Sequence, residues 1–386
     1  MKISRYITPV SSLLLLALNL AHASPLLTVG DNMNVFFDGS SSLVWQSNVF
    51  FDDEKEEDEL MLVITPGFEA NIGSDLSGFD AVIAGNYEIQ RFNERSELND
   101  EYFHFSTVAS YKGARLNLNA AYSFDEEQTT AGELGTFGSR FIEINRTRAY
   151  LLGEYVLSPK FSIESGVRYH DLDYQDISLR LADVESFSIP VDVFYELTPK
   201  VDLSFGYEYT AEAVSIPNAE DYDRESNFLN LGARGQLLPK LNGFFKVGFR
   251  SVNPEGPNRE TDQTLGLNAD FTYLATPKLT ANLRLNHGFD VGSEGQSLES
   301  TSAKLDLDYV ISGHYSARLF TYLSYLDFKD GNDGQDFINR TGFRFFYRPN
   351  EYCSFSTGYT YFENESNRLA QGFVNHILDI SASLRY

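Results

Sequence analysis

The feature that most constrains the fold of this chain is a strict alternation of apolar and polar residues, repeated along most of its length. In the stretch 201–209, every odd position is apolar or aromatic and every even position is polar or glycine. The segments 114–120, 281–286, 303–309 and 378–386 repeat the pattern. Because successive side chains of a β-strand point to opposite faces, each strand turns one face to an apolar medium and the other to water. The chain is therefore predicted to be all-β.

The N-terminal residues predict export from the cytoplasm. Lys2 and Arg5 precede a short leucine-rich stretch, and residues 21–23 (Ala-His-Ala) fit a small-x-small cleavage site. This is the three-part pattern of a secretory signal peptide, predicted over residues 1–23, with a single mature domain over 24–386. No later run of apolar residues is long enough for a membrane-spanning helix. If the mature chain lies in a membrane, it must do so as a closed barrel.

Two classes of break divide the strands. The short breaks carry Pro or Gly, and the spacings from Pro159 to Pro199, Pro239 and Pro277 are 40, 40 and 38 residues. The longer breaks are charged and lie at 52–59, 93–100, 126–139, 175–182, 213–225, 253–261, 291–298, 330–335 and 364–371. Eight short and nine long breaks predict 18 strands, although 16 remain possible. Short turns on one rim and longer loops on the other are typical of outer-membrane barrels.

The sequence thus predicts a single transmembrane, antiparallel, up-and-down β-barrel with short periplasmic turns and longer extracellular loops. Its first strand is expected near residues 42–51, and the expected location is the bacterial outer membrane. A β-propeller would need four strands in each period, where this chain has two. The chain ends on an alternating strand with a terminal aromatic, so Tyr386 and Leu384 are interpreted as an assembly signal for the outer-membrane assembly machinery.

Composition excludes several functions. The 55 acidic and 30 basic residues give a net charge of -25, which argues against a nucleic-acid partner. A single cysteine cannot form an internal disulfide or a cysteine-based metal centre. Neither a Gly-x-Ser-x-Gly nor a His-Glu-x-x-His motif is present, so no enzyme activity, catalytic residue, cofactor or metal site is predicted. A Ser–His pair formed across neighbouring strands stays open as an alternative.

The polar residues that alternate with the apolar positions along each strand are expected to line a water-filled lumen, because a barrel of this size is too wide for side chains to fill. The candidate lumen residues carry both signs of charge. They are Lys246, Arg250, Arg284, Asp306, Asp308, Arg318, Tyr322, Arg340, Arg344 and Arg348. Charged walls of both signs would sort solutes by charge, or they would only solvate the lumen and pair with each other.

The last three arginines of that set, Arg340, Arg344 and Arg348, are spaced four residues apart and would therefore point to the same face of one strand. They would form a vertical basic ladder of about 26 Å, at about 3.3 Å per residue. Such a ladder suits an anionic solute or a sugar acid. Alternatively, it neutralises Asp306 and Asp308 two strands away.

The segment 52–59 carries seven acidic residues and one lysine. Clustered carboxylates bind hard cations, so one interpretation is a bridge through divalent ions to lipopolysaccharide. The simpler interpretation, which we favour, is a solvated and charged outer loop.

The repeated turn-and-strand units of this chain resemble the β-barrel porin 2 family of Gram-negative bacteria. The resemblance rests on Leu157–Tyr169, which begins Leu-Ser-Pro-Lys-Phe, on Leu197–Tyr209, which begins Leu-Thr-Pro-Lys-Val, and on Val63–Phe68 with its Pro-Gly pair. Members are often associated with exopolysaccharide gene clusters. The resemblance implies a pore that exports polysaccharide, with polysaccharide and periplasmic export components as partners. It supplies no residue motif for a site.

Two further functions stay open from the sequence. One is a general or substrate-selective diffusion porin. The other is a surface-anchored barrel that binds a partner through its outer loops without transport. In each case the predicted surroundings are outer-membrane lipids and lipopolysaccharide.

Overall fold

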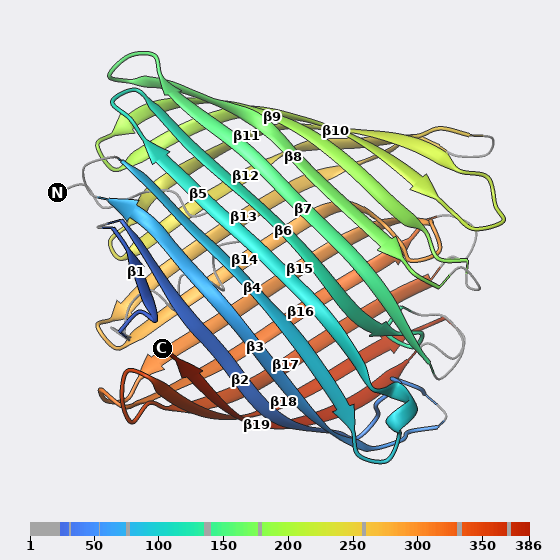
Figure 1. The fold of residues 1–386 in the computed structure, drawn as a ribbon. Coiled ribbons are helices and arrows are strands. Elements are labelled where there is room, and N and C mark those ends of the chain that lie inside the picture. The colour runs from blue at the N-terminus through green and yellow to red at the C-terminus, as the bar shows by residue number, and fades with distance from the viewer. Residues whose placement is uncertain are drawn as a thin grey trace.

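The chain folds into one closed antiparallel barrel. The computed structural model describes residues 24–30, 32–53, 55–74, 78–134, 140–176, 180–256, 260–329, 334–368 and 372–386. Within these residues, strands β2 to β19 form an eighteen-strand barrel in which each strand pairs with its neighbours in sequence and β19 pairs with β2, which confirms the predicted fold (Figure 1). The predicted signal peptide, 1–23, lies outside the described residues.

The barrel strands are long and similar in length. They are β2 (Met33–Gln46), β3 (Glu59–Ser74), β4 (Phe79–Phe92), β5 (Asp100–Lys112), β6 (Leu116–Thr130), β7 (Phe141–Val156), β8 (Phe161–Tyr174), β9 (Asp183–Thr198), β10 (Val201–Ser215), β11 (Tyr222–Leu238), β12 (Leu241–Pro254), β13 (Asp262–Thr276), β14 (Leu279–Val291), β15 (Ser297–Val310), β16 (Tyr315–Phe328), β17 (Gly334–Tyr347), β18 (Cys353–Ser366) and β19 (Phe373–Arg385). A short strand, β1 (Leu27–Val29), and a 3₁₀ turn, η2 (Ser96–Leu98), complete the elements. No helix of the described residues is long and apolar enough to cross a bilayer.

Three of the short turns are built from a repeated Ser/Thr-Pro-Lys sequence. In the β9–β10 turn, the Thr198 hydroxyl oxygen accepts the N–H groups of Lys200 and Val201, at 3.3 and 3.1 Å. Ser158 and Thr276 do the same at two other short turns. A side-chain oxygen that bonds the backbone two and three residues onward closes a tight turn, which is why these breaks need so few residues. In Figure 1 strand β1 and the C-terminus lie at the left, at the end that carries these turns.

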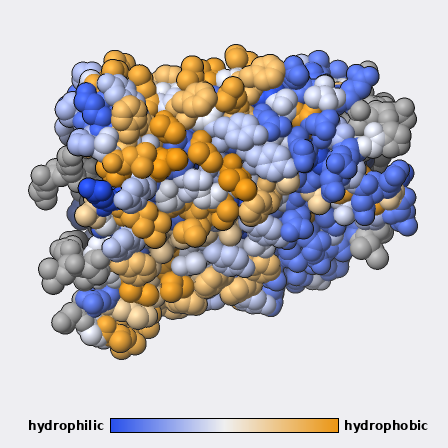
Figure 2. All heavy atoms as spheres, turned by 90° about the horizontal axis from the view of Figure 1, so that it is seen from above, coloured by the Kyte–Doolittle hydropathy of each residue, from blue (hydrophilic) through white to orange (hydrophobic). Residues whose placement is uncertain are grey.

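The outer face of the barrel is apolar over most of its height. Leu231, Leu265 and Ile380, from three separate strands, expose 62%, 64% and 66% of their surface. Figure 2 shows hydrophobic side chains toward the short-turn end and hydrophilic ones gathered at the long-loop end. An apolar band of this kind, on a barrel with no open sheet edge, is the form that spans outer membranes. The chain is an outer-membrane β-barrel, as predicted.

Tyrosines mark the border between the apolar band and the hydrophilic end. The hydroxyl of Tyr87 donates to Glu101 at 2.7 Å, and that of Tyr209 donates to Glu225 at 2.6 Å. Each ring is apolar and each hydroxyl reaches a carboxylate, so these side chains suit the boundary between lipid and water. They therefore mark the outward edge of the membrane-spanning segment.

The barrel closes between its first and last long strands. The β19–β2 ladder runs from Ile377 opposite Gln46 to Arg385 opposite Asp38. Beyond it, the backbones of Phe37 and Tyr386 exchange two hydrogen bonds, at 2.6 and 2.9 Å. Strand β1 then pairs with the part of β2 that extends past β19. The role of Tyr386 and Leu384 as an assembly signal stays a prediction.

The first barrel strand differs from its predicted position. It was expected near 42–51, but β2 covers Met33–Gln46. The apolar run Val49–Phe51, which resembles a strand, instead turns into the mouth of the barrel, where Val49 and Phe50 are buried. The run Ser40–Ser42 hides the alternation in the true strand.

Candidate functional site: the lumen and its outward mouth

The structure places the ten predicted lumen residues on five strands. Lys246 and Arg250 lie on β12, Arg284 on β14, and the other seven on β15 to β17 or just after β17. Five of them stand side by side across strands in two rows, together with Lys304 on β15. Lys304, Tyr322 and Arg340 form one row, and Asp308, Arg318 and Arg344 form the other. Arg348 lies one residue beyond the end of β17, so only Arg340 and Arg344 of the predicted basic ladder belong to the strand.

Four of these charged side chains are held by partners on the same or the adjacent strand. Arg284 pairs with Asp270 on β13 at 3.1 Å. Arg318 Nε donates to Asp308 Oδ1 at 2.7 Å, and Lys304 Nζ lies 3.8 Å from Asp306 Oδ2. The idea that the ladder neutralises Asp306 and Asp308 is therefore wrong. The reason is geometric, because a cation on the adjacent or the same strand reaches each carboxylate first.

Three guanidinium groups instead face aromatic rings. Arg250 lies 4.4 Å from the centroid of the Phe228 ring, Arg340 lies 5.3 Å from that of Phe362, and Arg348 lies 5.6 Å from that of Phe346. Among the described residues, none of the three has a carboxylate within 4.0 Å. A ring holds a cation in place without neutralising it. These groups therefore keep their charge available to the lumen.

The wall from β7 to β12, which carries the predicted lumen residues Lys246 and Arg250, is strongly curved. Arg234 on β11 donates to Glu154 on β7 at 2.5 Å, and Lys246 on β12 donates to Asp192 on β9 at 2.7 Å. These pairs skip three and two strands of the sheet. Since neighbouring strands lie about 4.8 Å apart, the wall must bend sharply for such side chains to meet. Alternation along one strand cannot reveal pairs of this kind.

At the outward end, two seams of the barrel open before their strands end. The β5–β6 ladder stops at His104 opposite Asp125, although β6 continues to Thr130. The β13–β14 ladder stops at Leu267 opposite His287, although both strands continue. In each case, the outward end of the strand after the open seam is paired, among the described residues, only with the next strand, in a hairpin. We call these the β6–β7 and β14–β15 hairpins.

The tips of these two hairpins meet across the mouth. The Ser293 hydroxyl in the β14–β15 tip donates to the Leu134 carbonyl in the β6–β7 tip at 2.7 Å. The β14–β15 tip is also held by the Ala182 N–H, which donates to the Ser293 carbonyl at 2.8 Å, and by the Tyr222 hydroxyl, which donates to the Gly295 carbonyl at 2.7 Å. The two hairpins are seven strands apart in the sheet, so their contact bridges the opening.

Apolar side chains anchor this bridge from inside the barrel. One cluster joins Ala131 of the β6–β7 tip to Ile142, Ile144 and Leu181. A second joins Ala182 to Val214 and Tyr222, and a third joins Val49 and Phe50 of the β2–β3 loop to Phe92. The sequence predicted a water-filled lumen because a barrel of this size is too wide for side chains to fill. That reasoning missed the bridge, because the bridge is built from the outward ends of strands that have separated from one neighbour, and the loops form only the tips of these hairpins.

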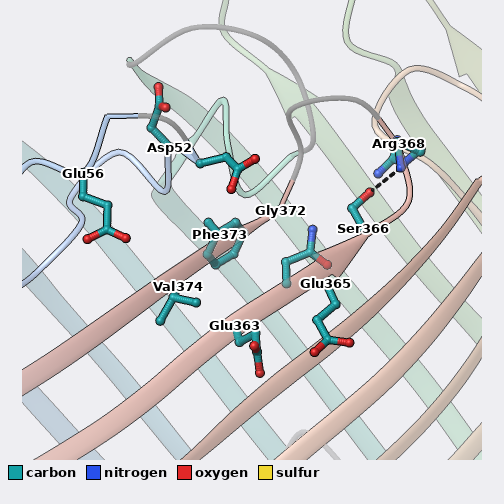
Figure 3. A pocket seen from close by; sticks show the side chains of 11 residues that line it. Asp52, Glu56, Glu363, Glu365, Ser366, Arg368, Gly372, Phe373 and Val374 are labelled. Atoms are coloured by element: carbon teal, nitrogen blue, oxygen red, sulfur yellow. Dashed lines mark hydrogen bonds between the residues drawn. The ribbon is translucent and has the colours of Figure 1, made fainter.

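A cavity of about 360 Å³ lies at the mouth beside this bridge (Figure 3). The β2–β3 loop and the outward ends of β18 and β19 line it, with the acidic residues Asp52, Glu56, Glu363 and Glu365. Arg368 also lines it, but its guanidinium is already bound to Asp336. The cavity is therefore acidic and open to the outside.

The acidic loop is held by basic partners. Glu57 is paired with Lys55 and, at 2.5 Å, with Arg95, and Glu59 pairs with Arg95 at 2.8 Å. In the part of the chain that the structure describes, no three His, Cys, Asp or Glu side chains are grouped so that they could hold a metal ion. These contacts favour the interpretation of 52–59 as a charged outer loop.

Comparisons with known proteins give only distant structural likenesses. No family model and no curated protein matches the chain. The outer-membrane protein OpdK of Pseudomonas aeruginosa superimposes with a TM-score of 0.45 and 12% identity, over 92% of this chain and 99% of that one. Acinetobacter baumannii OccAB4 gives a TM-score of 0.45 and 11% identity, over 93% and 100% of the two chains. A mutant of the ferric enterobactin receptor of Pseudomonas aeruginosa gives 0.46 and 9%, over 91% and 81%.

Proposed function

We propose that this barrel is an outer-membrane channel for small polar and charged solutes, narrowed at its outward mouth. The observation that carries the proposal is the bridge between Ser293 and Leu134, which stands over a lumen lined by charged side chains. Polar walls keep water in the lumen, and a constriction makes passage depend on solute size and charge.

The charges of the wall support selectivity by charge. Arg250, Arg340 and Arg348 face rings on β11, β18 and β17. On the curved wall, Glu164 makes no ion pair among the described residues. A solute in the lumen would thus meet Arg340 and Arg348 on one side, and Arg250 together with the carboxylate of Glu164 on the curved wall. Such transverse fields orient dipolar solutes and exclude those of the wrong charge.

Polysaccharide export, which the resemblance to the β-barrel porin 2 family implies, is the second form of this proposal. It needs the two hairpin tips to part, because a polymer chain would have to pass where Ser293 contacts Leu134. The bridge therefore favours small solutes in its present form. Polymer passage would require a partner or a condition that moves the hairpins.

A crosslink across the bridge tests both forms. In a Cys353→Ser background, Leu134→Cys and Ser293→Cys together should form a disulfide that locks the tips. We expect the locked barrel to conduct small ions in planar bilayers with unchanged single-channel steps, and reduction to have no effect on them. An export pore would instead need the tips to move, so reduction would restore polymer passage that the crosslink abolishes.

Each single-cysteine variant is the control, since it changes the tip without joining it. Wild-type barrels that fold and never conduct would overturn the channel proposal in either form. Conductance that the crosslink abolishes and reduction restores would show that ions, too, pass only when the tips separate.

A further inference from the structure

Gly206, in the middle of β10, lies between two polar residues on the inner face of the curved wall. Asp192 on β9 and Asn230 on β11 are its partners in the two neighbouring ladders. Both side chains are nearly fully buried, with 2% and 3% of their surface exposed. Because glycine has no side chain, the space above it is left to these two neighbours.

One oxygen of each neighbour has no hydrogen-bond partner among the described residues. Asp192 Oδ2 accepts from Lys246 at 2.7 Å, and Asn230 Nδ2 donates to the Phe228 carbonyl at 3.4 Å, which leaves Asp192 Oδ1 and Asn230 Oδ1 unpaired. A Cβ atom on Gly206 would lie 2.2 Å from the first oxygen and 2.8 Å from the second. Two acceptors thus converge on one small volume, and buried acceptors require a donor or a cation.

The same arrangement occurs elsewhere in the barrel with its cation built in. Gly358 on β18 lies between Arg344 and Asp379 in its two ladders. There the guanidinium reaches over the glycine and donates to the carboxylate at 2.8 Å. At Gly206 the position that corresponds to the arginine holds Asn230, which offers an oxygen. The wall at Gly206 therefore keeps the acid and the glycine, but no cation in the described part of the chain reaches the oxygen that faces the glycine, because Lys246 binds the other oxygen of Asp192.

The charges around Gly206 also favour a cation. Near Gly206, four described ion pairs connect four carboxylates with three basic side chains, Arg250 on β12 adds a fourth basic side chain, and Glu164 adds a fifth carboxylate beside Asp192. The carboxylates are Glu154, Glu164, Asp192, Asp202 and Glu208, and the basic residues are Arg168, Arg234, Lys246 and Arg250. Acid is in excess, in a region where charge is poorly screened.

We propose that Asp192 Oδ1 and Asn230 Oδ1 bind a compact monovalent cation above Gly206, either an alkali-metal ion or the ammonium group of a solute. Only one carboxylate oxygen and one amide oxygen point to the volume, which suits a single charge better than a divalent ion with its six or more oxygen ligands. The inference rests on the proposed function, because the site would lie on the solute path and would favour cations along the curved wall.

Salt-specific stability tests the site without requiring conduction. The full barrel, folded in detergent, is unfolded in urea at equal ionic strength in sodium, potassium, ammonium, methylammonium or choline chloride. A bound cation stabilises the folded state by mass action, so the midpoint should be higher in compact cations than in choline. A shift in sodium and potassium identifies an alkali-ion site, whereas a shift only in ammonium and methylammonium identifies an amine site.

Gly206→Ala should remove this salt dependence, because its methyl group fills the volume. Gly358→Ala is the matched control and should keep it, since that site already holds a guanidinium. If Gly206→Ala folds poorly, Asn230→Leu removes the oxygen at similar size, and Asn230→Asp should enlarge the salt effect. Equal midpoints in all five salts for the wild type, or an unchanged salt effect in Gly206→Ala and Asn230→Leu, would overturn the proposal.

Conductance separates this inference from the proposed function. In a conducting barrel, Gly206→Ala should lower the cation-to-anion permeability ratio about threefold or more. A barrel that never conducts but shows the salt effect would refute the channel and keep the site. A conducting barrel without the salt effect would keep the channel and refute the site.

Discussion

The two ends of the barrel have opposite polarity along the same strands. Toward the short turns, apolar side chains such as Leu231 face outward and charged ones face the lumen. At the long-loop end, the exterior is hydrophilic (Figure 2), and Ile142 and Leu181 are buried inside with 1% exposed. The solvent outside each segment therefore decides which face of a strand is apolar.

Strand β7 shows the change within one element. On its inner face, Ile142 and Ile144 belong to an apolar cluster at the mouth, and Arg146, two residues further along, is ion-paired with Glu127. On its outer face, Leu151, nearer the short turn, exposes 50% of its surface. An apolar side chain that already contacts lipid gains no hydrophobic free energy by moving into the interior of the protein. Once a strand leaves the membrane, its apolar residues do gain from moving inside.

The strongest test of this contrast places a charge on the lipid side. Leu231→Arg should destabilise the barrel by about 2–4 kcal/mol, the usual effect of arginine near the middle of the lipid-facing surface. The measurement is urea unfolding of the barrel in phospholipid vesicles. Ser302→Arg, on the lumen face of β15, is the control and should change stability by less than about 0.5 kcal/mol. Equal effects would mean that the two faces are assigned wrongly.

A smaller test removes one methylene group from each kind of apolar surface. Ile142→Val leaves a gap in the packed cluster at the mouth and should cost about 0.5–1.5 kcal/mol. The effect should be local, seen as faster hydrogen exchange of the Ala131 and Ala182 amides, whose hydrogen bonds hold the tips. Ile380→Val, on the lipid face, should be nearly neutral because lipid fills the space. A larger effect at Ile380 would contradict the proposed difference between the ends.

The smallest effect concerns the acidic β2–β3 loop. Hydrogen bonds from Lys55 and from Arg95 lower the pKa of Glu57 below its ordinary value of 4.5. A lowered pKa in the folded state stabilises the loop above about pH 4.5, and this contribution is lost as pH falls through the lowered pKa. Trp45, the single tryptophan, donates to Asp58 of the same loop at 3.3 Å and reports on it.

We therefore expect Trp45 fluorescence to change below about pH 4.5 in the wild type and to lose that transition in Glu57→Gln. The charge of the rest of the barrel is unaltered by this substitution. A transition that survives in Glu57→Gln would assign the effect to another acid of the loop.

The membrane-spanning part of the fold could be predicted from the sequence because lipid on one face and water on the other enforce alternation along most of the strands. The segment 201–209 lies inside β10, and the Ser/Thr-Pro-Lys sequences at 158–160 and 198–200 lie at the tight turns before β8 and β10. Alternation fails where the strand leaves lipid. That is why Val49–Phe51 was mistaken for the end of a strand.

The site was less predictable because its contacts join distant strands. Parity places Arg344 in the lumen, but its partner is Asp379, two strands and 35 residues away. The hairpin bridge joins residues 159 positions apart through one hydroxyl. The signal that could have shown the site is the glycine at 206, within an alternating strand, where a close approach of neighbouring side chains is expected.

The seam between β2 and β19 closes the barrel, and it can form only after β19 has been synthesised. Phe37 and Tyr386 exchange hydrogen bonds across almost the whole length of the chain, so the ring cannot close until its last strand is present. Closing so long a loop carries a large entropic barrier and makes folding slow. Until then, each nascent chain holds two unpaired strand edges, which invite pairing with other copies. Between synthesis and insertion, the chain therefore avoids aggregation only if those edges are kept from pairing with other copies.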